Sequence, residues 1–340
     1  PKIRFINTIK NAPRTLFSSF FSVFPPLLTF LSQNTEAFIN FQLLPWRNEF
    51  EFPKNIINPQ KYISIPTNQG FISLAEKTNI QTYAQKILSP NYDNITIDEF
   101  GGFLNDIYLI HANTNHSEKK IIVKRFKDLS SIKWFPLSMW SIGARSFALL
   151  GKSRLDKECA INEYLASQGF NVPKIYHVSA NQRLVFMEFL EGKNLSTIIK
   201  KIAKTKPKFS NPTELNLIKQ TGIIYAKIHS LNVVLGDTKP DNIMLNPNGQ
   251  LYLLDFEQAS RNGDKAWDIA EFLYYSGHYL PINGEQKAQA ITQAFIEGYL
   301  SAGGETKTIK AAAQPKYTRV FSIFTLPNIL LAITKICKKT

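Results

Sequence analysis

Cysteine and acidic residues are scarce in this chain of 340 residues. The two cysteines, Cys159 and Cys337, are far apart and form no Cys-x-x-Cys spacing, and the five histidines are scattered. These absences argue against a disulfide framework or a zinc site, and they favour a cytoplasmic location. Acids number 26 against 40 basic residues, which gives a formal net charge of +14. Such an excess attracts polyanions (nucleotides, RNA or an anionic membrane) or belongs to a basic soluble protein, and charge alone leaves these alternatives open.

Charge is missing altogether from residues 15–35, which follow a basic and acid-free stretch at residues 1–14. This order resembles a signal peptide or a membrane anchor, but the Pro25-Pro26 pair interrupts any straight spanning helix. We expect an interfacial segment or a helix packed on the domain. The apolar stretch 317–340 has basic ends and contains Pro327. We expect it to form a final packed helix, with membrane contact as the alternative.

Changes in composition and hydrophobic pattern divide the chain into an N-terminal extension and two lobes. Residues 1–70 combine the apolar segment with an arm rich in Pro, Asn and Gln, which reads as irregular. Residues 71–188 are expected to form a small lobe, and residues 189–340 a mainly helical lobe with the C-terminal tail. The hydrophobic content of 44% is ample for such a core.

Within the small lobe, residues 71–89 roughly follow the helical period and predict an amphipathic helix. From residue 94 three short runs rich in β-branched and aromatic residues predict a strand meander. Residues 156–168 predict a helix that ends at Gly169. A small antiparallel sheet with one helix, followed by a helical half, is a bilobal α+β plan.

Two segments carry the chemistry, GDTKPDNIML at residues 236–245 and LYLLDFE at residues 251–257. Asp237 and Asn242 are five residues apart on one loop, so one side chain can face an acceptor hydroxyl and the other a metal ion. Asp255 follows a hydrophobic strand that fixes its carboxylate at the strand end. Lys239 can neutralise charge on a transferred phosphoryl group. Oxygen ligands of this kind hold Mg²⁺ or Mn²⁺ on the phosphates of ATP.

These segments resemble the protein-kinase-like superfamily, whose catalytic loop reads His-Arg-Asp-Leu-Lys-x-x-Asn and whose metal-binding strand ends in Asp-Phe-Gly. The resemblance implies that Asp237 and Lys239 are catalytic and that Asn242 and Asp255 bind metal. It also implies that Asp268 braces the catalytic loop by accepting backbone hydrogen bonds. We expect His229 to pack near that loop.

The resemblance extends into the small lobe. Lys124 lies where the family has the strand lysine that binds the α- and β-phosphates, and its partner is a helix glutamate. Glu158 suits an inward-facing position, and Glu163 is the competitor. The alternative is that Lys124 merely ends a strand in water.

Two weaker segments complete the predicted nucleotide site. Gly101 and Gly102 stand in place of the usual three spaced glycines, and a double glycine is also an ordinary turn. A similar Gly-Gly-x-x-Asn pattern occurs in aminoglycoside and choline kinases. Glu188, Phe189 and Leu190 resemble the hinge whose backbone binds adenine.

Three departures from the family pattern shape the expected function. Gly236 replaces the arginine that reads activation-segment phosphate. Asp268 follows Asp255 by only thirteen positions without an Ala-Pro-Glu segment, so the usual peptide-docking platform is nearly absent. Glu257 replaces the glycine of Asp-Phe-Gly, as in choline and ethanolamine kinases.

The insertion at residues 130–154 interleaves aromatic residues with cations, which suits a membrane, RNA or lipid headgroups, or else a hairpin or helix packed over the small lobe.

The chain therefore looks most like the small archaeal-type serine/threonine kinases related to the kinase subunit of the tRNA-threonylcarbamoyladenosine complex, and it also resembles lipopolysaccharide-core kinases. We expect an enzyme that uses ATP with Mg²⁺ or Mn²⁺ to phosphorylate a protein serine or threonine. A small-molecule, sugar or lipid acceptor is the alternative. A nucleotide-binding scaffold with little turnover is a further one.

Overall fold

The structure, a computed structural model, describes most of the chain beyond residue 63. The described residues are 64–67, 70–73, 79–88, 91–101, 105–114, 117–127, 151–180, 182–205 and 212–340. The predicted interfacial segment, most of the insertion and Gly102 lie outside these ranges.

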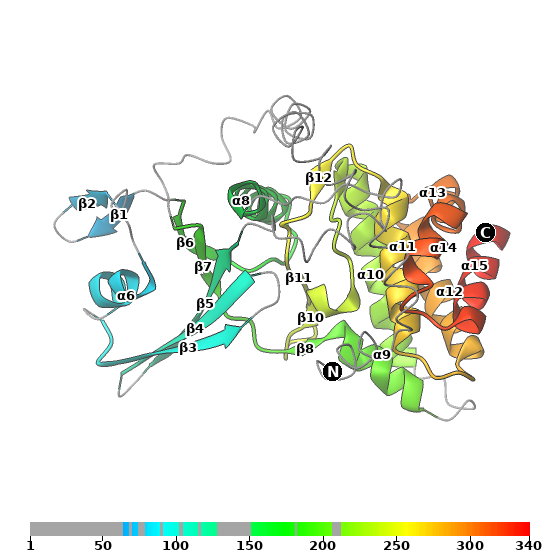
Figure 1. Ribbon diagram of the computed structural model, residues 1–340, viewed down its shortest axis with the longest axis horizontal. Helices are drawn as coiled ribbons and strands as arrows, with labels where there is room; N and C mark the ends of the chain where they lie inside the picture. The colour runs from blue at the N-terminus through cyan, green and yellow to red at the C-terminus, as the bar shows by residue number, and fades with distance from the viewer. Residues whose placement is uncertain are drawn as a thin grey trace, which may run out of the picture. The chain divides into compact units, whose positions relative to one another are not determined.

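A five-stranded antiparallel sheet forms the small lobe, in the order β3-β4-β5-β7-β6 (Figure 1). Its strands are β3 (Asn94–Gly101), β4 (Asn105–Asn113), β5 (Glu118–Phe126), β6 (Ile175–Ser179) and β7 (Leu184–Glu188). The β-branched and aromatic runs that predicted the meander supply its core, in which Ile110, Ile121 and Phe186 are fully buried. Helix α8 (Gly151–Ser167) packs on β5 and β7.

The segment before the meander corrects two expectations. Instead of an irregular arm followed by one helix at 71–89, β1 (Ser64–Thr67) and β2 (Gly70–Ser73) form an antiparallel hairpin that pairs Ile65 with Ile72. The helix is confined to α6 (Ile80–Tyr83) and a π-helical turn at Ala84–Leu88. Asn79 explains this start, because its side chain accepts a hydrogen bond from Thr82 N at 2.7 Å as an N-cap.

His177 gives the small lobe a testable dependence on pH. The side chain is buried, stacks on Tyr83 at 5.7 Å between ring centroids, and burial lowers its pKa to about 4. Below about pH 6.5 the unfolded chain takes up a proton at this residue and the folded chain does not. We therefore expect the free energy of unfolding to fall by about 2 kcal/mol from this group between pH 7 and pH 5. Urea unfolding at pH 7 and at pH 5 measures this change in the free energy of unfolding. The His177→Phe variant should lose the part of the change that comes from His177. An equal change in the variant and in the wild type would contradict the prediction.

The helical lobe begins after the hinge and contains the catalytic segments. Its helices are α9 (Leu195–Lys204), α10 (Pro212–Ser230), α11 (Lys265–His278), α12 (Glu285–Ser301), α13 (Thr306–Ala312), α14 (Pro315–Phe321) and α15 (Pro327–Lys339). Short strands β8 (Lys193–Asn194), β10 (Ile243–Leu245) and β11 (Leu251–Leu253) form one sheet, while β9 (Val233–Val234) pairs with β12 (Ser260–Arg261). In Figure 1 the labelled strands β8, β10 and β11 lie between the small-lobe sheet and the helices. The predicted bilobal α+β fold is confirmed.

The C-terminal stretch packs on the helical lobe, as expected. Pro327 occupies the first turn of α15, where its missing N–H is tolerated. Ile329, Ile333 and Cys337 recur along one face of this helix and are buried. Over the part of the chain that the structure describes, no helix combines the length and apolar character needed to cross a membrane.

Candidate active site

Asp268 of α11 holds the start of the catalytic loop. Its carboxylate accepts hydrogen bonds from Leu235 N at 2.7 Å and Gly236 N at 2.8 Å, and His229 Nε2 lies 3.1 Å from the same group. Both expected positions, the brace at Asp268 and the packing of His229, are observed. Buried backbone N–H groups that lacked such partners would cost about 1–3 kcal/mol each. The loop therefore keeps one conformation.

Gly236 has a backbone φ of 82°, in the left-handed region. A residue with a Cβ is strained in that conformation, whereas glycine adopts it freely. This conformation gives a physical reason why the arginine of the family pattern is absent here.

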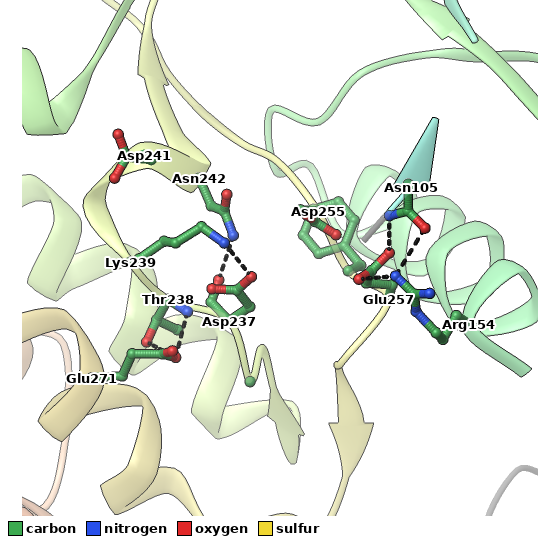
Figure 2. A network of polar contacts seen from close by, with 12 residues as sticks. Asn105, Arg154, Asp237, Thr238, Lys239, Asp241, Asn242, Asp255, Glu257 and Glu271 are labelled. Atoms are coloured by element: carbon green, nitrogen blue, oxygen red, sulfur yellow. Dashed lines mark hydrogen bonds and ion pairs between the residues drawn. The ribbon is translucent and has the colours of Figure 1, made fainter. Parts of the chain in front are cut away.

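Asp237 and Lys239 face each other at the front of the loop. Lys239 Nζ lies 2.6 Å from Asp237 Oδ2, and Asn242 Nδ2 donates to Asp237 O at 2.9 Å (Figure 2). Burial would lower the pKa of Lys239, but the carboxylates of Asp237 and Asp255 raise it above its ordinary value. Lys239 therefore stays charged beside an aspartate that is partly open to solvent.

Asn242 and Asp255 both line the same cleft. Leu254 N donates to Asn242 O at 2.8 Å, which places the residue before Asp255 against the end of the catalytic loop. Asp255 itself has φ of 65°, a conformation that is uncommon outside glycine and that concentrates at functional sites. Two oxygen-bearing side chains on one cleft, with phosphate oxygens to complete the shell, suit Mg²⁺. Among the described residues no group of three or more His, Cys, Asp or Glu could hold a metal by itself.

Lys124 lies among three carboxylates. Its Nζ is 2.6 Å from Asp255 Oδ1, 3.1 Å from Glu257 Oε2 and 3.4 Å from Glu158 Oε2. The ion pair expected with Glu158 is therefore present, and Lys124 does not end a strand in water. Burial would lower the pKa of Lys124, but these acids hold it well above the ordinary value. The ammonium is charged and close to where phosphates would bind.

Arg154 and Glu257 form a contact that the sequence did not predict. Arg154 Nη2 lies 2.6 Å from Glu257 Oε1 and donates to Asn105 Oδ1 at 2.8 Å (Figure 2). Arg154 was counted among the cations of the insertion, for which a membrane or RNA surface and a packed helix were both left open. At this residue the packed helix holds, because α8 begins at Gly151 and the Arg154 side chain is 0% exposed. Burial would raise the pKa of Glu257, but Lys124 and Arg154 lower it to about 2.

A cleft of about 480 Å³ joins these groups to the hinge. It is lined by Asn105, Ile107, Ile122, Lys124, Glu158, Pro173, Met187, Glu188, Phe189, Leu190, Asn242, Met244, Leu254 and Asp255. The predicted hinge residues thus lie on the same cavity as Lys124 and the predicted metal-binding residues, Asn242 and Asp255. Glu188 N already donates to Lys174 O at 2.8 Å. Gly101 ends β3, next to residues outside the described ranges.

A lysine paired with a helix glutamate, a braced catalytic loop and an aspartate at a strand end, joined across one interlobe cleft, define a protein-kinase-like fold. Comparisons with known proteins agree. The model of the ABC1 atypical kinase-like domain matches residues 155–276.

Three relatives are similar to this chain. A probable bifunctional tRNA threonylcarbamoyladenosine biosynthesis protein of Methanobrevibacter smithii is 30% identical over 46% of this chain and 26% of its own length. The KEOPS complex subunit Bud32 of Pyrococcus abyssi is 27% identical over 44% of this chain and 72% of its own length. A probable serine/threonine-protein kinase BUD32 homolog of Archaeoglobus fulgidus is 23% identical over 44% and 68%. The chain thus spans less than two thirds of the first relative's length. Its similarity to the ABC1 model and to the Bud32 proteins supports a protein-kinase-like fold of the atypical, archaeal type.

Proposed function

We propose that this protein transfers the γ-phosphate of ATP to a hydroxyl group, with a protein serine or threonine as the first candidate acceptor. The observation that carries the proposal is the linkage of Asp237, Asn242 and the segment of Asp255 beside one cleft. The side chain of Asn242 donates a hydrogen bond to the backbone oxygen of Asp237 at 2.9 Å, and the backbone oxygen of Asn242 accepts one from Leu254 N, just before Asp255, at 2.8 Å. Acceptor, metal and phosphate positions are thereby held together before a nucleotide arrives.

Each residue has a defined part in the proposed reaction. Asp237 orients the acceptor hydroxyl and accepts its proton, and Lys239 offsets the negative charge that develops on the transferred group. Lys124 binds the α- and β-phosphates, and Glu158 positions Lys124. Asn242 and Asp255 would hold Mg²⁺ or Mn²⁺, which neutralises charge on the phosphates when bound.

The adenine end of the nucleotide fits the hinge side of the cleft. Met187 and Ile122 give this end apolar walls, which suit an aromatic base. Since the amide of Glu188 is already donated to Lys174 O, adenine would bond to the backbone of Phe189 and Leu190. Gly101 and Gly102 would cover the phosphates.

A small-molecule, sugar or lipid acceptor is the second candidate. The segment after Asp255 is short, and β12 within it pairs back onto β9, at the start of the catalytic loop. Little of that segment remains to bind an extended peptide. A bound acceptor would instead meet α11, where Tyr275 and Tyr279 lie 6.0 Å apart between ring centroids. Aromatic rings of this kind could pack against the flat face of a rigid acceptor.

The test is incubation of purified protein with radiolabelled ATP, Mg²⁺ and separate panels of proteins, tRNA, sugars and lipids. Label transferred to a protein panel supports the first candidate, and label on a sugar or lipid supports the second. Nucleotide binding with no transfer to any panel or to the protein itself would support the scaffold alternative. RNA and protein partners are included because the relatives are named for tRNA modification and for the KEOPS complex.

We also propose contact with an anionic membrane through α15 and the turn that joins it to α14. Ile323, Leu326 and Leu331 are 58%, 39% and 65% exposed, and residues 306–340 contain seven basic residues and no acid. Apolar side chains beside cations favour an anionic lipid surface. Ile323→Ser with Leu331→Ser should abolish flotation with anionic vesicles. Phe100→Ser, at a residue 55% exposed in β3 of the small-lobe sheet, is the matched control. Equal flotation of both variants contradicts the proposal.

A further inference from the structure

Arg154 is a buried cation whose hydrogen bonds reach across the two lobes. Its side chain is 0% exposed. From α8 it contacts Glu257 Oε1 at 2.6 Å, in the turn after Asp255, and it donates to Lys127 O at 2.8 Å through Nη1. A buried charge is tolerated only when it is paired and hydrogen-bonded, and Arg154 has both kinds of contact.

Asn105 completes the contact from β4. It donates to Glu257 Oε2 at 2.7 Å and accepts from Arg154 at 2.8 Å, so it bridges the arginine and the carboxylate. Figure 2 shows the three side chains converging beside Asp255. Side chains of the small lobe therefore bind both carboxylate oxygens of Glu257.

Helix α8 is tied to the same turn at a second point. Glu158 lies one helical turn after Arg154, on the same face, and its Oε2 accepts a hydrogen bond from Phe256 N at 2.8 Å. Consecutive residues, Phe256 and Glu257, are thus bound by side chains one turn apart on α8. This pair of contacts fixes the helix that carries Glu158 relative to the turn that carries Asp255.

We propose that Arg154 is a positioning residue, which holds Glu257 and α8 so that Lys124 and Asp255 stay in the phosphate-binding arrangement without a phosphorylated activation segment. This inference rests on the proposed function for its biological meaning. In the family pattern this positioning depends on the arginine that Gly236 replaces here. In this protein we assign it to the permanent buried contact between Arg154 and Glu257.

The effect of losing Arg154 follows from the distances. Glu257 Oε2 is already 3.1 Å from Lys124 Nζ. Without Arg154, the Glu257 carboxylate keeps only Asn105 and Lys124 as partners. Its negative charge is then balanced by the Lys124 ammonium alone, and no longer by two cations. Lys124 is then drawn toward Glu257 and away from nucleotide phosphates. Neutralising Glu257 as well should release Lys124 again.

The experiment uses four variants of the full chain: Arg154→Met, Glu257→Gln, the double variant, and Lys201→Met as a control. The control is matched because Lys201 pairs at 2.5 Å with buried Glu214, between α9 and α10, so it also leaves a buried carboxylate without its cation. Affinity for a non-hydrolysable ATP analogue with Mg²⁺ is measured for each. Hydrogen exchange of residues 254–258 is followed in the nucleotide-free proteins.

We expect Arg154→Met to weaken nucleotide binding by about tenfold or more, because a buried charge has lost its partner. The double variant should recover to within about threefold of the wild type, since no unpaired charge remains. Exchange at residues 254–258 should accelerate in Arg154→Met and not in Lys201→Met. Should Arg154→Met fail to fold, Glu257→Gln alone must still accelerate this exchange.

Unchanged exchange and affinity in Arg154→Met would overturn the inference. Equally weak nucleotide binding in Arg154→Met and in the double variant would also overturn it. That result would indicate a general loosening of the fold, which a second buried change cannot reverse. A wild type that binds no nucleotide would reject the proposed function instead. The exchange measurement would still decide the role of Arg154.

Discussion

Asp237→Ala is expected to lower the rate of phosphate transfer by a factor of about a hundred to ten thousand, the range found when a positioned acid or base is removed. Nucleotide affinity should stay near that of the wild type, because Asp237 does not line the described nucleotide cleft. Single-turnover transfer of labelled phosphate and analogue binding measure the two quantities separately.

Asp241→Asn is the matched control for this variant. Asp241 lies on the same loop, but its carboxylate accepts hydrogen bonds from Ser196 at 2.7 Å and from Tyr279, and it is absent from the cleft lining. The control should keep most of the transfer rate. If Asp237→Ala retained full turnover while Asp241→Asn lost it, the two aspartates would have been assigned the wrong way round.

Asp255→Asn is expected to abolish the gain in nucleotide affinity that Mg²⁺ provides, and turnover with it. The change keeps the shape of the side chain but removes the only negative charge of the two proposed metal ligands, which weakens their attraction for a hard divalent cation. It also frees Lys124, whose Nζ lies 2.6 Å from Asp255 Oδ1, so affinity for metal-free nucleotide should hold or rise. Binding is titrated with Mg²⁺ and again with a chelator.

The contrast between the two conditions is the informative quantity. If Mg²⁺ raises the nucleotide affinity of the wild type strongly and that of Asp255→Asn not at all, Asp255 is assigned as a metal ligand. Asp241→Asn should behave like the wild type in both titrations. The same Mg²⁺ effect in Asp255→Asn and wild type would place the metal on other residues.

The parts of the fold that the sequence predicted are those with strong local patterns. The strands of the meander contain β-branched residues whose alternate side chains, such as Ile121 and Val123, are buried. The hairpin of β1 and β2 was missed because Pro66 and the Asn and Gln residues near it read as an irregular arm, while pairing with a second strand decides the conformation. Asn79 carries a local N-cap signal that could have placed the start of α6.

The candidate site was predictable where its residues lie in one motif or where a family pattern relates them. Asp237 and Asn242 share a loop, and the Lys124–Glu158 pair was expected from the resemblance. The contact between Arg154 and Glu257 joins residues 103 positions apart, and nothing local marks either as buried. Arg154 lies near aromatic residues in sequence, which left a surface role and a packed helix both open. Only the packing of α8 against the turn after Asp255 shows that it faces inward.

The left-handed backbone at Gly236, with φ of 82°, restricts how this protein could evolve. An arginine introduced at that position would carry a conformational penalty of about 1 kcal/mol or more. Control by phosphorylation of the neighbouring segment, gained through this one replacement, would therefore lower the stability of the protein from the outset.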